Sequence, residues 1–136
     1  MTWTTFDHTG DIGIEVSAPA LESLFAEAAR AMFEQIADLA GVRNETEEEI
    51  VVEGTDPAEL LRDWLAELLY RFSAEGRIYA DFEVLIEPGR VRARARGERY
   101  DGTRHPLRTE IKAVTYHRLQ VAKEEAGWRA RVVLDV

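Results

Sequence analysis

The residues of this sequence whose types could do chemistry are mainly carboxylates, and they gather near its two ends. Asp7, His8 and Asp11 lie close together near the N-terminus. At the other end Asp135 is followed directly by Val136, so a side-chain carboxylate stands next to the terminal one. Carboxylate oxygens suit hard divalent cations, and a carboxylate beside a histidine can transfer protons. The alternative is that these residues form no site, and are only the polar residues of a turn and the end of a chain that stops at its last strand. Whether Asp11 lies near the chain end depends on the fold.

Familiar catalytic motifs are missing from the sequence. It contains no Gly-rich phosphate loop, no nucleophile elbow and no paired-His metalloprotease motif, and its three histidines, at 8, 105 and 117, are far apart. The absence of cysteine excludes disulfides, thiolate metal sites and thiol nucleophiles, and favours a reducing compartment. We therefore expect a protein that is not an enzyme of a familiar motif class.

The charge of the chain is acidic, with one basic patch. Lys and Arg number 17 against 26 Asp and Glu, which gives a formal net charge of −9 and argues against a dedicated nucleic-acid binder. Arg90, Arg92, Arg94 and Arg96 alternate with small apolar residues and so project from one face of a strand. This face could meet phosphates, including those of RNA, or an acidic protein surface. The alternative is an edge strand that charge protects from aggregation and that pairs with acidic neighbours.

Hydrophobic periodicity predicts the elements that must position these residues. We expect strands over 11–17, 50–52, 82–86, 91–95, 111–121 and 128–134, and helices over 19–41 and from 57 to about 76. Residues 82–86 and 91–95 flank a Pro-Gly turn and form a hairpin, 100–108 form a loop, and the last two strands form a closing hairpin. On the second helix Asp63, Glu67 and Arg71 recur at four-residue intervals, which predicts a solvated face with an ion pair between Glu67 and Arg71.

This order of elements, β-α-β-α-β-β-β-β, predicts an α+β fold. We expect a two-layer sandwich in which one mainly antiparallel sheet carries two amphipathic helices. No repeat or linker interrupts the chain, and 46% hydrophobic residues suffice for one core, so residues 1–136 are expected to form a single domain. The N-terminus lacks a signal-peptide pattern, and no stretch approaches the ~20 apolar residues of a membrane helix. We expect a soluble cytoplasmic protein without a membrane partner.

Four blocks of the sequence together resemble the archease family. They are Asp7–Gly13 (DHTGDIG), Trp64–Tyr70 (WLAELLY), Glu110–His117 (EIKAVTYH) and Val132–Val136 (VVLDV). The blocks are spread from the first expected strand to the last residue, so the resemblance covers nearly the whole chain. Gly10 stands where the family more often has Ala, which exchanges one small residue for another.

The resemblance implies an activator of an RtcB-type RNA ligase, the enzyme that joins tRNA halves through a GMP-bound histidine. Members of the family are not ligases themselves; they promote guanylylation of the ligase and its multiple turnover in tRNA splicing. Nucleic acid would then be a partner only indirectly. A general chaperone or modulator of nucleic-acid-processing proteins is the alternative, because it needs only an exposed surface. A stand-alone hydrolase that uses Asp11 and His8 would lack any substrate-recognition motif.

The resemblance also assigns residues. It implies a divalent cation, calcium in the family with manganese or magnesium as alternatives, bound by Asp11, Asp135 and the free carboxylate of Val136. Lys112 is similar to a residue that activation needs, and it would compensate phosphate charge. As a further hypothesis about this implied site, Glu67, His8 and Asp7 would orient the groups that bind the cation.

Overall fold

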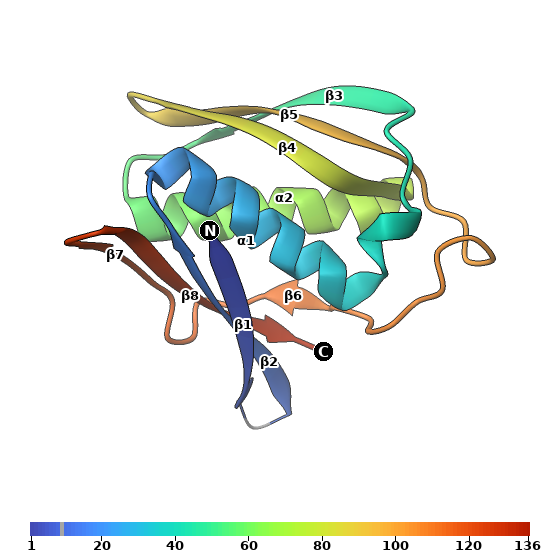
Figure 1. The fold of residues 1–136 in the computed structure, drawn as a ribbon, viewed down its shortest axis with the longest axis horizontal. Helices are drawn as coiled ribbons and strands as arrows, with labels where there is room; N and C mark the ends of the chain where they lie inside the picture. The colour runs from blue at the N-terminus through green and yellow to red at the C-terminus, as the bar shows by residue number, and fades with distance from the viewer. Residues whose placement is uncertain (9) are drawn as a thin grey trace.

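Two antiparallel sheets enclose a layer of two helices in this protein (Figure 1). The computed structural model describes residues 1–8 and 10–136, apart from the side chains of Asp7 and His8. The five-stranded sheet contains β1 (Thr2–His8), β2 (Asp11–Ala18), β8 (Gly127–Asp135) and β6 (Ala113–Val114) in that order, with β7 (Gln120–Glu124) also paired to β8. The three-stranded sheet has the order β3 (Thr46–Glu53), β5 (Arg90–Arg99), β4 (Arg77–Glu87). Between the sheets lie α1 (Leu21–Ile36) and α2 (Pro57–Glu75), and a 3-10 turn, η1 (Leu39–Gly41), follows α1.

The expected α+β class, the antiparallel pairing and the two amphipathic helices are confirmed. The strands form two sheets on opposite sides of the helices, where the sequence predicted one. Helix α1 contacts β4 on one side and β2 and β8 on the other, and the buried residues of α2 likewise lie between strands of both sheets. Alternation along a strand shows which residues share a face, but it does not show which strands share a sheet.

Helix α2 begins and ends where its local sequence predicts. The Asp56 carboxylate accepts a hydrogen bond from the Glu59 N–H at 3.0 Å, and Pro57 fills the first turn. Gly76 ends the helix in the left-handed conformation, with φ of 67°. Inside the molecule the Trp64 indole N–H donates to the Phe25 carbonyl at 3.0 Å, so a buried hydrogen bond joins the two helices.

Three expected segments differ from the structure. The helix expected over 19–41 is α1 followed by the separate turn η1. Strand β1 was not expected, and it forms a hairpin with β2. The single strand expected over 111–121 is split into β6 and β7, because Arg118 has a positive φ of 53° and Leu119 N–H donates to Tyr116 O in a turn. No helix in the described chain is long and apolar enough to cross a membrane.

Candidate functional site

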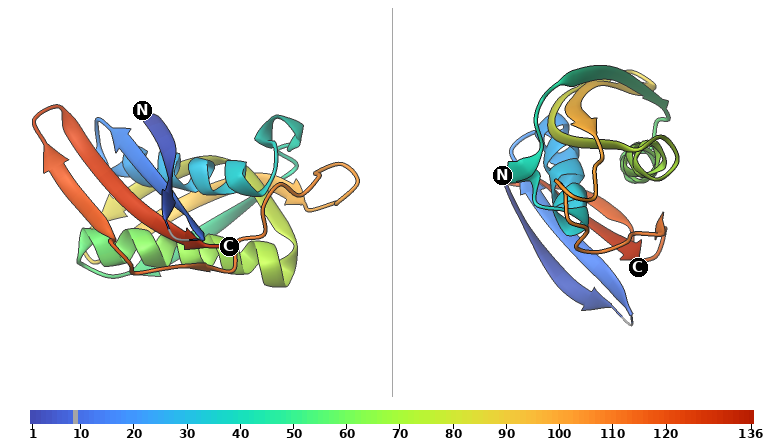
Figure 2. Two further views of the ribbon diagram at one scale, coloured as in Figure 1. Left: turned by 90° about the horizontal axis from the view of Figure 1, so that it is seen from below. Right: turned by 90° about the vertical axis from the view of Figure 1, so that its right-hand side faces the viewer.

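The register of β2 against β8 brings Asp11 to the chain end. Ile12 pairs with Leu134 and Gly13 with Val133 in this antiparallel ladder. Asp11 precedes Ile12 and Asp135 follows Leu134, so one more step of the same register sets the two aspartates opposite each other. Figures 1 and 2 show the C-terminus at the end of the five-stranded sheet where β2 begins. Residues from the two ends of the chain therefore meet.

The two aspartates also share one face of the sheet. Ile14, Val132 and Leu134 are buried towards the helices, and Asp11 and Asp135 are out of phase with them in the alternation of their strands. Both aspartates are half-buried. Val136 packs its side chain against the core, which fixes the last residue of the chain beside Asp135.

Lys112 comes to the same place from the other side of β8. Ala113 pairs with Asp135, and the Lys112 N–H donates to the Asp135 carbonyl at 2.7 Å. Thr115 continues the connection, since both its N–H and its hydroxyl donate to the Val133 carbonyl. The Lys112 side chain is exposed. Three of the four sequence blocks thus meet at one end of one sheet.

The predicted orienting residues differ in their placement. In the β1–β2 hairpin His8 pairs with Asp11 and Asp7 with Ile12, so the backbone carries both residues to this end of the sheet. Their side chains lie outside the described residues, and their roles stay predictions. Glu67 accepts a hydrogen bond from Arg71 Nε at 2.8 Å, as its spacing on α2 predicts. This ion pair directs the Glu67 side chain to Arg71 on the same helix, and no described contact links Glu67 to Asp11 or Asp135.

The groups at this end of the sheet carry donor atoms of the type that hard divalent cations bind. Asp11, Asp135 and the terminal carboxylate of Val136 offer only oxygen, the donor that calcium, magnesium and manganese prefer. Only two of these three groups, Asp11 and Asp135, are side-chain carboxylates. In the part of the chain that the structure describes, no group of three or more His, Cys, Asp or Glu side chains could hold a metal ion. A cation here would therefore depend on the main-chain carboxylate and on water or a partner for its remaining ligands.

The arginine face lies on the other sheet and is neutralised by carboxylates. Arg96 Nε donates to Glu47 at 2.7 Å, and its two terminal nitrogens donate to Asp81 at 3.0 Å and to Glu83 at 2.9 Å. These bonds hold the pKa of Arg96 above its ordinary value. The arginines do pair with acidic neighbours, but the expectation of an edge strand is wrong: β5 is the middle strand, flanked by β3 and β4.

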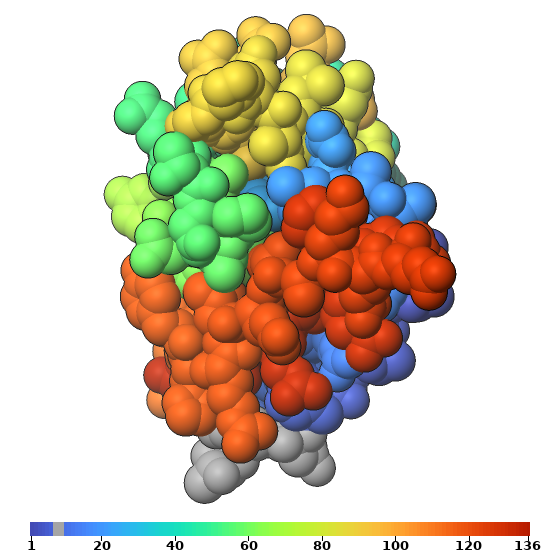
Figure 3. All heavy atoms as spheres, turned by 90° about the vertical axis from the view of Figure 1, so that its left-hand side faces the viewer, coloured from blue at the N-terminus to red at the C-terminus, as the bar shows by residue number. Residues whose placement is uncertain are grey.

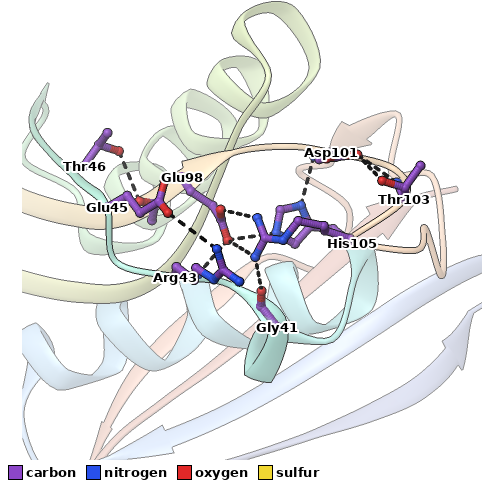
Figure 4. Close-up of polar contacts among 10 residues, drawn as sticks. Gly41, Arg43, Glu45, Thr46, Glu98, Asp101, Thr103 and His105 are labelled. Atoms are coloured by element: carbon purple, nitrogen blue, oxygen red, sulfur yellow. Dashed lines mark hydrogen bonds and ion pairs between the residues drawn. The ribbon is translucent and has the colours of Figure 1, made fainter.

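A buried polar cluster, which the sequence did not indicate, ties the 100–108 loop to β5 (Figure 4). Glu98 and His105 are 3% and 1% exposed. His105 Nδ1 accepts from the Asp101 N–H at 2.9 Å, so its Nε2 carries the proton and donates to Glu98 at 3.0 Å. Arg104 and the Arg43 N–H also donate to Glu98. Hydrogen bonds from Arg104, Arg43 and His105 lower the pKa of Glu98 to about 2.

Comparison with known proteins places this geometry in a family. Residues 3–136 match the archease protein family. The chain belongs to the archease family. It is 46% identical to the archease of Methanopyrus kandleri over 140 residues that span both chains fully. It is 42% identical to the archease of Methanosarcina mazei, with 96% of this chain and 92% of that one covered. The solution structure of Methanobacterium thermoautotrophicum protein 1598 superposes with a TM-score of 0.86 at 34% identity, and 98% of each chain is covered.

The archease resemblance seen in the sequence is thereby confirmed. In two of its blocks the structure shows what one residue does in the fold. Gly13 lies under the Phe6 ring, where a Cβ would approach the ring carbons to 2.1 Å. Trp64, in the second block, is fully buried and holds α1 to α2. The archease fold thus uses these residues for packing, while the blocks that contain Lys112 and Asp135 supply exposed or half-buried polar groups.

Proposed function

We propose that this protein activates an RtcB-type RNA ligase in cytoplasmic tRNA processing, as a non-catalytic partner that promotes ligase guanylylation and multiple turnover. One observation carries the proposal: Asp11, Lys112 and Asp135 come from three separate sequence blocks and converge at one end of the five-stranded sheet. Packing alone does not require polar groups there, because the buried side of the same strands is filled by apolar residues. A converging set of carboxylates beside a lysine suits work on a metal and a phosphate.

In this proposal the residues have separate tasks. Asp11, Asp135 and the Val136 carboxylate would hold a divalent cation, which supplies positive charge for phosphate oxygens when bound. Lys112 would add a fixed positive charge for the triphosphate of GTP next to that position. His8 and Asp7 would orient Asp11 through the β1–β2 hairpin. Glu67 would act through its helix, which contacts β6.

The deciding experiment follows transfer of labelled GMP from GTP onto a purified cognate ligase. The assay contains catalytic ligase and manganese and compares the protein with its Asp135→Asn variant. We expect stimulation by the protein and a large loss of stimulation in the variant. The matched control is Glu49→Gln, since Glu49 is an exposed carboxylate on β3 in the other sheet.

Each other result has a defined meaning. Full stimulation by Asp135→Asn would favour the alternative, a chaperone or modulator that works through its surface. Absence of stimulation by the unaltered protein would refute the proposed function while leaving the fold and the family intact. Loss of stimulation in Glu49→Gln as well would mean that total charge matters and that the chain end does not.

A further inference from the structure

We propose that the outward face of α2, together with Tyr116, is the surface on which the partner protein docks. This tyrosine strip consists of Arg62, Ala66 and Tyr70 on α2 and of Tyr116 on the segment between β6 and β7. The inference rests on the proposed function, because it names the surface that would hold the ligase while the chain end reaches the catalytic site of that enzyme.

The two tyrosines of the strip are unusually exposed for their size. Tyr70 is 59% exposed and Tyr116 is 61% exposed. The Arg62 guanidinium lies 4.4 Å from the centroid of the Tyr116 ring. Arg62, Ala66 and Tyr70 follow one another at four-residue intervals, so they form one stripe along the helix, about 12 Å long. The strip thus carries one exposed aromatic ring on α2, Tyr70, and a second, Tyr116, that lies against Arg62.

The strip is continuous with the candidate site. Arg62 Nε donates to the Val114 carbonyl at 3.0 Å, and Val114 pairs with Leu134, the neighbour of Asp135. Figure 2 shows α2, the segment around β6 and the C-terminus on one side of the molecule. In Figure 3 the first turns of α2, in green, lie directly against the orange segment that contains Tyr116. A protein that covers the strip would therefore also approach the chain end.

Charge favours a protein over RNA as the occupant. Exposed tyrosines can stack on bases, but RNA binding also needs cations that are available to phosphates. Both arginines of α2 are engaged: Arg62 lies 3.1 Å from Asp63, and Arg71 lies 2.8 Å from Glu67. The strip is thus aromatic and nearly neutral on a chain of net charge −9. Tyrosine and arginine with little net charge are typical of the centres of protein interfaces.

The expected partner is complementary to both parts of this side. Its contact with the strip would be apolar and aromatic, and its catalytic region, which handles GTP and RNA, would present positive charge to the acidic chain end. Docking and chemistry are then separate contributions. Loss of the strip weakens binding, whereas loss of the chain-end carboxylates lowers what the bound protein achieves.

The test measures stimulation of ligase guanylylation against the concentration of this protein. We expect Tyr70→Ser and Tyr116→Ser each to raise the half-maximal concentration about tenfold or more, with an unchanged plateau. Asp135→Asn should lower the plateau. The matched control is Leu85→Ala, because Leu85 is 54% exposed on β4 in the other sheet and should change neither quantity. Thermal unfolding of each variant establishes that it is folded.

The outcomes separate this inference from the proposed function. Stimulation by the unaltered protein with unchanged half-maximal concentrations in both tyrosine variants would overturn the docking surface alone. If the unaltered protein does not stimulate, the proposed function fails, and direct binding to the immobilised ligase decides about the strip: equal affinity of the unaltered and tyrosine variants, or no binding at all, overturns it. Tyrosine-dependent binding of a single-stranded RNA oligonucleotide to the protein alone would assign the strip to RNA and overturn the inference.

Discussion

The Phe6 ring lies directly on Gly13, its cross-strand partner in the β1–β2 hairpin. A Cβ at Gly13 would approach the ring to 2.1 Å, so only glycine allows this contact. On the same ring stacks the guanidinium of Arg131, 4.9 Å from the centroid, which links β1 to β8 across β2. This arrangement lies two residues from Asp11 and holds the hairpin in register where the candidate site begins.

Replacing Gly13 by alanine should therefore displace the Phe6 ring. We expect Gly13→Ala to lower the free energy of unfolding by about 1–3 kcal/mol, the usual cost of overpacking. Urea unfolding followed by circular dichroism measures this loss. In a Phe6→Ala background the same change should cost much less, because the ring that clashes is gone. Equal losses in both backgrounds would contradict the proposed contact.

The stability of the protein should depend on pH through Glu98. Its pKa falls from 4.5 to about 2 on folding, because Arg104 and its other partners hydrogen-bond the carboxylate. A lowered pKa gives stability that is complete above pH 4.5 and is lost as the pH falls towards 2. We expect Glu98→Gln to be less stable than the unaltered protein at pH 7, by about 1–3 kcal/mol, since a neutral amide is a weaker acceptor for the hydrogen bonds of Arg104 than the buried carboxylate is.

Urea titrations between pH 7 and pH 2.5 test this dependence. The difference in unfolding free energy between the unaltered protein and Glu98→Gln should shrink as the pH falls. Glu49→Gln, which changes an exposed carboxylate, should leave the pH profile nearly unchanged. A constant difference at all pH values would show that the charge of Glu98 does not stabilise the fold.

Binding of a divalent cation should depend on the chain end. Calorimetric titration with Ca²⁺ should give an affinity about tenfold or more weaker for Asp11→Asn and for Asp135→Asn, because each removes a charged ligand. Two added residues after Val136 should weaken it as well, since the terminal carboxylate becomes an amide. Equal affinity in all forms would place any cation elsewhere, and Glu49→Gln controls for the change in net charge.

Lys112 should matter for activation and hardly for stability. Its side chain is exposed, and its described hydrogen bond to Asp135 comes from the backbone. We expect Lys112→Gln to lower the plateau of ligase guanylylation at least tenfold while the melting temperature stays within about 2 °C, as for surface substitutions in general. A melting temperature that falls together with the activity would reassign Lys112 to the fold.

Local signals predicted one part of this structure well. Asp56 and Pro57 predict where helix α2 begins, and Gly76 predicts where it ends. The turn residues Pro88 and Gly89 predict the β4–β5 hairpin. Signals of this kind act within a few residues of the chain, where backbone sterics and capping decide the outcome.

Long-range relationships could not be predicted in the same way. Asp11 and Asp135 meet because of the register between β2 and β8, which no local pattern contains. Strand β1 was missed because a short, threonine-rich segment shows no clear alternation without its neighbour β2. The burial of Glu98 was missed because its partners, Arg104 and His105, lie in a segment that the sequence identifies only as a loop.

Helix α1 packs against both sheets at once. Arg30 is the only exposed residue along its whole length, and even that side chain reaches the Ala80 carbonyl on β4. Neither sheet can separate from α1 without exposing both its own apolar side and the apolar side of the helix that it covers. Partial opening of the molecule at α1 is therefore costly. The amide hydrogens of α1 should therefore exchange with solvent only when the whole chain unfolds, at one common rate.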